Sequence, residues 1–179
     1  MPQEMLLAAI VASAVSIFIA VLFAHAGISK WLSPEAYRAT VAAVLGERRA
    51  IHAVRLIASV EIAVSVIVLL PISRGLGLIA ACALLATYAG VMLIQLKQGN
   101  TNLRCGCSGP SSDTRISSEL IWRNLLLACG ALWAASGVVL GPLEATAVAA
   151  GLSLVLGFIY AAVDQLIQNR QLWLRGVSA

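Results

Sequence analysis

Charged side chains are scarce in this sequence. Asp, Glu, Lys and Arg make up 11% of its 179 residues, whereas the hydrophobic residue types make up 60%. Soluble domains are typically about 25% charged and about 45 to 50% apolar. The composition therefore excludes a water-soluble globule, a disordered tail and a nucleic-acid-binding module, and we expect no nucleic-acid partner. In a chain of this kind, the basic residues behind the formal net charge of +4 indicate first on which side of the membrane each loop lies.

Cysteines are few, no internal repeat is visible, and a cleavable leader is not expected. The four cysteines are too few for the disulfide scaffold of a secreted protein of this length. No Lys or Arg precedes the first apolar stretch, which exceeds the roughly 7 to 15 apolar residues of a signal peptide. We therefore expect this stretch to be an uncleaved membrane span.

Long apolar stretches dominate what is present. Five of them reach the roughly 20 residues that a helix needs to cross a bilayer. They cover about residues 5–29, 50–70, 74–96, 119–140 and 143–167. None alternates with the period of two that barrel strands require, so helices are the remaining way to satisfy the backbone in lipid. The sequence predicts an all-α polytopic membrane bundle of four to five transmembrane helices, forming one domain over residues 1–179.

A shorter helix is expected between the first two spans. Ser33 can cap it, Pro34 suits its first position, and Glu35 complements its positive end. It should end at about Leu45, before Gly46. Its apolar residues recur at helical spacing, which predicts a helix on the membrane surface or folded against the bundle.

Lys and Arg are distributed unevenly around the spans. With five spans, the segment after the first span, the loop at 99–118 and the C-terminal end share one side of the membrane. That side holds Lys30, Arg38, Arg48, Arg49, Arg55, Lys97, Arg104, Arg115, Arg123, Arg170 and Arg175. The other side holds Arg74 alone. The positive-inside rule then predicts a cytoplasmic loop at 99–118 and an external N-terminus.

The loop at 99–118 contains the sharpest motif, Cys105-Gly106-Cys107. A disulfide between residues two apart requires a bent backbone, which glycine permits, and such a small ring should be strained. Strained, exposed disulfides have the oxidising potentials of labile or catalytic bridges. Arg104 and Arg115 would favour the reactive thiolate. Redox chemistry is the leading interpretation, with metal ligation and no function as the alternatives.

The remaining cysteines lie inside predicted spans. Cys82 and Cys129 fall in the stretches 74–96 and 119–140. Buried cysteine usually behaves as a small apolar residue, so both are interpreted as packing residues. They can form a second pair only if the two helices face each other at those positions.

Two polar residues within the spans are candidates for function. Glu61 lies in the middle of the stretch 50–70, where a charge is costly, and is expected to be a proton-relay group, the partner of Arg55 or Lys30, or a hydrogen-bonded packing carboxyl. His25 lies near the end of the first span, and the interpretations are a quinone or proton contact and an ordinary interface histidine.

Several of these segments together resemble a known family. They are the Gly27-Ile28-Ser29-Lys30 end of the first span, the segment 34–38, the glycine-rich start of the span at 74–96, and the Cys105-Gly106-Cys107 loop. They resemble the MauE branch of the MauE/DoxX redox-associated membrane proteins, over most of the chain up to about residue 140. The resemblance implies a multi-pass protein of the bacterial inner membrane.

The resemblance also implies a role. Members of the MauE branch are implicated in maturing the methylamine dehydrogenase small subunit, a periplasmic polypeptide dense in disulfides, alongside the thioredoxin-like protein MauD. The family's cysteine loop corresponds to Cys105 and Cys107 here. A periplasmic role requires this loop to be outside, which conflicts with the cytoplasmic side that the charge count predicts.

Three functional hypotheses follow. The leading one is a membrane thiol–disulfide protein in which Cys105 and Cys107 exchange with a thioredoxin-like partner. A membrane quinone would then take or supply the electrons, by analogy with other membrane disulfide oxidoreductases. The second is a soft-metal binding or transport protein that uses the same thiolates, with Glu61 marking a path. The third is a membrane scaffold for a maturation complex.

Overall fold

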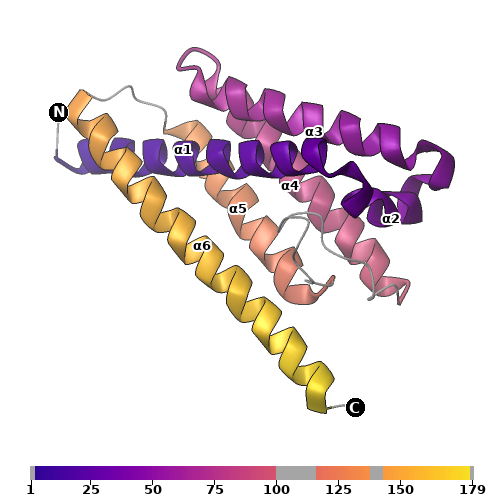
Figure 1. The fold of residues 1–179 in the computed structure, drawn as a ribbon. Helices are drawn as coiled ribbons and strands as arrows, with labels where there is room; N and C mark the ends of the chain where they lie inside the picture. The colour runs from indigo at the N-terminus through magenta and orange to yellow at the C-terminus, as the bar shows by residue number, and fades with distance from the viewer. Residues whose placement is uncertain (1–2, 100–115, 138–142, 178–179) are drawn as a thin grey trace.

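The computed structural model describes residues 3–99, 116–137 and 143–177. These residues form six α-helices and no strand. In chain order the helices are α1 (Gln3–Leu32), α2 (Pro34–Leu45), α3 (Glu47–Leu69), α4 (Arg74–Lys97), α5 (Ser118–Ser136) and α6 (Leu143–Val177). The predicted all-α fold is confirmed (Figure 1).

Helix α2 occupies the place expected for the short helix. Pro34 is at its first turn, and the chain leaves it at Gly46, whose positive φ of 81° is a conformation that glycine adopts without strain. Ser33 makes no side-chain hydrogen bond to the helix start, so the expected cap is not formed. Tyr37 is the buried residue of α2.

Helices α1 and α3 lie side by side (Figure 1), and they approach each other closely at Gly27. A Cβ atom on Gly27 would lie 2.8 Å from Cγ1 of Ile62 and 2.9 Å from the backbone oxygen of Ala58. The Ser65 hydroxyl also donates to the backbone oxygen of Ala20, at 2.8 Å. Only a glycine allows the two backbones to approach this closely.

Helices α4 and α5 form an antiparallel pair. Leu78 and Leu85, in the first half of α4, share a core cluster with Ala131 from the second half of α5. Met92, near the end of α4, clusters with Leu120 near the start of α5. The larger cluster also includes residues of α1 and α3, so the apolar core lies among these four helices.

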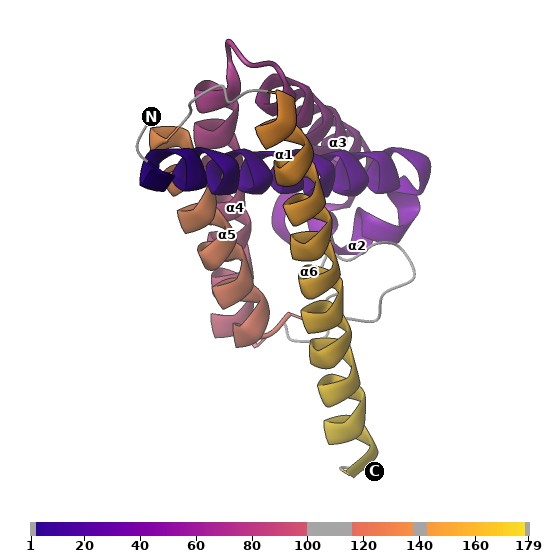
Figure 2. The ribbon, with the colours of Figure 1, turned by 90° about the vertical axis from the view of Figure 1, so that its left-hand side faces the viewer.

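Helix α6 packs mainly on α1 and then leaves the bundle. It is 35 residues long, and its C-terminal half extends beyond the other helices (Figure 2). The predicted span ended at residue 167, ten residues before the helix does, because the polar residues from Gln168 onward interrupt the hydropathy but not the helix. Arg170 pairs with Glu119 of α5 at 2.8 Å. The end of α6 therefore lies at the same end of the bundle as the start of α5.

Four helices are long and apolar enough to cross a membrane. They are α1, α3, α4 and the part of α6 from Thr146 to Trp173. Helix α5 is shorter, at 19 residues, and carries Glu119, Arg123 and Asn124 in its first half. The four spans agree with the four to five predicted. Of the stretch expected at 119–140, residues 138–140 are outside the described part of the chain.

Candidate functional site

A buried ion pair joins α1 to α3. The Nζ atom of Lys30 lies 2.9 Å from both carboxylate oxygens of Glu61. Glu61 is 1% exposed and Lys30 is 7% exposed. Lys30 lies one turn after Gly27, so the close helix contact at that glycine brings the ammonium group within reach of the carboxylate. The structure thus gives Glu61 one of the two cations expected from the sequence.

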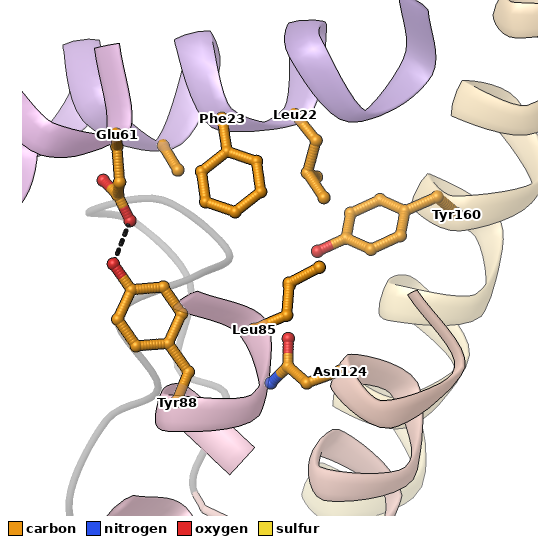
Figure 3. Close-up of a pocket in the computed structure, with 8 residues that line it drawn as sticks. Leu22, Phe23, Glu61, Leu85, Tyr88, Asn124 and Tyr160 are labelled. Carbon is orange, nitrogen blue, oxygen red and sulfur yellow. Dashed lines mark hydrogen bonds between the residues drawn. The ribbon is translucent and has the colours of Figure 1, made fainter. Parts of the chain in front are cut away.

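The same carboxylate also holds α4. The Tyr88 hydroxyl donates a hydrogen bond of 2.6 Å to Oε1 of Glu61 (Figure 3). Lys30 in turn lies 5.3 Å from the ring centroid of Tyr37 in α2, which is within cation–π range. One acidic side chain therefore connects α1, α3 and α4 directly and α2 through Lys30.

A small cavity adjoins this cluster. Its volume is about 20 Å³, which is enough for one water molecule. Glu61 and Tyr88 lie on one side of it, and Asn124 and Tyr160 lie on the other (Figure 3). Asn124 is 2% exposed and lies 3.7 Å, through Nδ2, from the sulfur of Met92. This arrangement can hold a single small polar molecule between the Lys30–Glu61 pair and helices α5 and α6.

A second buried ion pair joins α5 to α6. Arg123 binds Asp164 directly, and Gln168 donates to the other Asp164 oxygen at 2.8 Å. The guanidinium carbon of Arg123 lies 5.0 Å from the ring centroid of Tyr160. Arg123 is 7% exposed and Asp164 is 8% exposed. Both ion pairs are thus enclosed, and Tyr160 lies between the second pair and the small cavity.

Sequence reasoning missed this second pair. Arg123 entered only as a topology charge, and Asp164 was not singled out. The signal was present, because Asp164 lies inside the predicted span at 143–167 and an ionisable residue within a span is a functional candidate by default. The partner of Asp164 is 41 residues away and could be found only from the fold.

His25 lies elsewhere. Its side chain is exposed and lines a groove of about 520 Å³ between α1 and α6, not the cavity beside Glu61. The two site residues proposed within the spans, Glu61 and His25, are therefore not brought together at one cavity.

The cysteines are also separated. Cys82 is half-buried against the core and Cys129 is exposed, and both are free thiols, so they do not form a second pair. Cys105 and Cys107 fall outside the residues that the structure describes. Within the described ranges, no group of three or more His, Cys, Asp or Glu side chains is placed to hold a metal ion.

The fold and the two enclosed ion pairs define a multi-pass helical membrane protein. Its sequence matches the family described as methylamine utilisation protein MauE over residues 8–137. The chain therefore belongs to the MauE family, as the resemblance in the sequence predicted.

Two relatives agree with this assignment. The methylamine utilization protein MauE of Paracoccus denitrificans is 33% identical over 128 residues, which cover 70% of this chain and 68% of the relative. The protein of the same name from Methylophilus methylotrophus is 28% identical over 166 residues, covering 88% and 86%. The comparison with solved structures found no match.

Proposed function

We propose that this protein is a membrane thiol–disulfide redox protein that assists disulfide formation in a partner during methylamine utilisation. Its partners would be a thioredoxin-like protein and a disulfide-rich polypeptide such as the methylamine dehydrogenase small subunit. The membrane would be the bacterial inner membrane. The observation that carries the proposal is that the family match at 8–137 reaches from α1 to the end of α5 and includes the residues Cys105-Gly106-Cys107.

The chemistry needs only the two loop thiols. A thiolate of Cys105 or Cys107 attacks a sulfur of the partner's disulfide, forms a mixed disulfide and releases the partner's other sulfur as a thiolate. The second thiol then attacks the mixed disulfide and completes the exchange. The reverse sequence of the same steps oxidises the partner. Arg104, beside the motif, favours the thiolate that starts either direction.

The described helices support this role as a scaffold. The Tyr88 hydrogen bond fixes α4 to the Lys30–Glu61 pair, and the Arg123–Asp164 pair fixes α5 to α6. These two anchored helices flank the segment that contains the motif. The structural role assigned to Glu61 is thus to hold α4 in register with α1 and α3. A proton-relay role for Glu61 would use the same contacts with Tyr88 and the adjacent cavity.

The first experiment measures thiol exchange. A Cys82→Ser/Cys129→Ser background leaves the two loop cysteines as the remaining thiols, since the chain has four. In this background a purified thioredoxin-like partner should be oxidised or reduced by membranes that contain the protein. Adding Cys107→Ser should abolish the exchange and trap a mixed disulfide on Cys105. Full exchange by the Cys107→Ser variant would refute the proposal.

A second experiment settles the side of the membrane. A membrane-impermeant maleimide is added to intact cells and to opened vesicles of the same background. Labelling of the loop thiols in intact cells supports a periplasmic maturation role. Labelling only after opening agrees with the charge count and rules out direct exchange with a periplasmic partner. Stoichiometric metal in the purified protein, lost on alkylation, would favour the soft-metal alternative instead.

A further inference from the structure

The groove between α1 and α6 is a hollow that the proposed thiol exchange does not use. Its volume of about 520 Å³ falls in the range of small-molecule sites. Ser153, Gly157 and Ala161 lie on one face of α6 at intervals of four residues and form part of its wall. Because these side chains are small, α6 leaves space beside the larger side chains of α1.

The walls combine aromatic rings with a few polar groups. Phe18 comes from α1, and Phe158 and Tyr160 come from α6. The rings of Phe18 and Tyr160 meet edge to face, with centroids 5.9 Å apart. Phe158 is 76% exposed, so the groove opens on the outer surface of the bundle, which faces lipid in a membrane span. A flat, apolar molecule can therefore enter it sideways from the bilayer.

The polar groups select what enters. Both carboxylate oxygens of Asp164 are already engaged by Arg123 and Gln168. The exposed imidazole of His25 makes no hydrogen bond or ion pair with the residues that the structure describes, so it can donate to a ligand. A lipid acyl chain has no hydrogen-bonding group to meet it. A planar ring with a carbonyl oxygen satisfies both the aromatic walls and the histidine.

We propose that this groove binds the ring of a lipid-soluble quinone, with His25 donating to a quinone carbonyl and the isoprenoid tail in the bilayer. The inference deepens the redox role proposed above and depends on it for the use of the quinone. Oxidation of the Cys105 and Cys107 thiols to a disulfide releases two electrons and two protons. A quinone takes up both to become the quinol, so the exchange is balanced without another reactant.

Two glycines of α6 provide a matched test. A Cβ atom at Gly157 or at Gly151 meets nothing within 4 Å, so neither position is closed to a side chain by its immediate surroundings. Gly157 lines the groove and Gly151 does not. In nanodiscs, an azido derivative of a short-chain quinone should label peptides of α1 and α6 on illumination. Gly157→Leu should reduce that labelling at least tenfold, whereas Gly151→Leu should leave it unchanged.

The histidine is tested in the same assay. Loss of one hydrogen bond in His25→Leu should weaken labelling by about tenfold, as expected for about 1.4 kcal/mol. His52→Leu is the control, since His52 is the other histidine and lies in α3, outside the groove. Equal labelling of the Gly157→Leu and Gly151→Leu variants would overturn the proposal. It would also be overturned if a fatty acid prevented the labelling as fully as unlabelled quinone does at the same concentration.

A cysteine variant separates this inference from the proposed function. Cys105→Ser/Cys107→Ser should keep quinone labelling even though it cannot exchange disulfides. Labelling that persists while thiol exchange is absent from the unmodified protein supports the site and refutes the redox role. Exchange without groove labelling supports the redox role and refutes the site.

Discussion

Replacing Glu61 with Gln should strongly destabilise the protein, because it leaves the Lys30 ammonium group enclosed without its counter-charge. Lys30 is 7% exposed, and the carboxylate that it would lose lies 2.9 Å away through both oxygens. Removing one partner of a buried ion pair typically costs about 3 to 5 kcal/mol. For a chain of this size each kcal/mol lowers Tm by about 2 to 4 °C. The expected fall in Tm is therefore about 6 to 20 °C.

A double variant shows whether the charge is the cause. Lys30→Met/Glu61→Gln removes both charges and keeps an amide oxygen to accept the Tyr88 hydroxyl. Because replacing a whole buried pair is often neutral, its Tm should return to within a few degrees of the parent protein. Arg55→Met, at an exposed position on α3, is the matched control and should change stability by less than about 0.5 kcal/mol.

The assay is thermal unfolding of detergent-purified protein, followed by tryptophan fluorescence. The reasoning predicts strong non-additivity: the double variant must be more stable than the Glu61→Gln single variant. An unchanged Tm for Glu61→Gln would show that the pair contributes nothing. A double variant as unstable as the sum of the two singles would show that the residues act independently, and either result would refute the argument.

The other two predictions concern α4 and α6. Gly77→Ala should destabilise the protein by about 1 to 3 kcal/mol, because the added Cβ would lie 2.7 Å from the backbone nitrogen of Val68. Gly75→Ala is the control: its Cβ meets nothing within 4 Å, so the change should be neutral or mildly stabilising. Thermal unfolding checks both variants, and equal Tm values would contradict the packing argument. Asp164→Asn should lower stability by about 3 to 5 kcal/mol, since it leaves the Arg123 charge enclosed. If Asp164→Asn unfolds at the parent temperature, the pair is not needed to hold α6.

Much of the fold could be predicted because its signals are local. Hydropathy over windows of about 20 residues reports a span whatever its neighbours are, and the sequence around Pro34 and Gly46 delimits a short helix by backbone chemistry alone. Glu61 was identified for a similar reason, since a carboxyl in a long apolar stretch must find a partner.

The rest depended on which helices meet. The choice of Lys30 over Arg55 follows from the close approach at Gly27, and hydropathy carries no information about helix contacts. Helix α5 looked like a fifth span, but polar residues that pack against α4 and α6 lower its hydropathy. The groove lined by His25 exists because α6 crosses α1 with small residues along this side. It is a property of the two helices together, so the sequence of either helix alone does not reveal it.

The length of α6 has a consequence for its orientation. Its apolar portion before Gln168, residues 146–167, has 22 residues and spans about 33 Å, against a hydrocarbon thickness of about 30 Å. Hydrophobic mismatch of this size is relieved by tilting, and a thinner bilayer demands more tilt. Since α6 forms one wall of the groove that it shares with α1, a change in its tilt should change the width of that groove. The width should therefore vary with the acyl-chain length of the surrounding phospholipids.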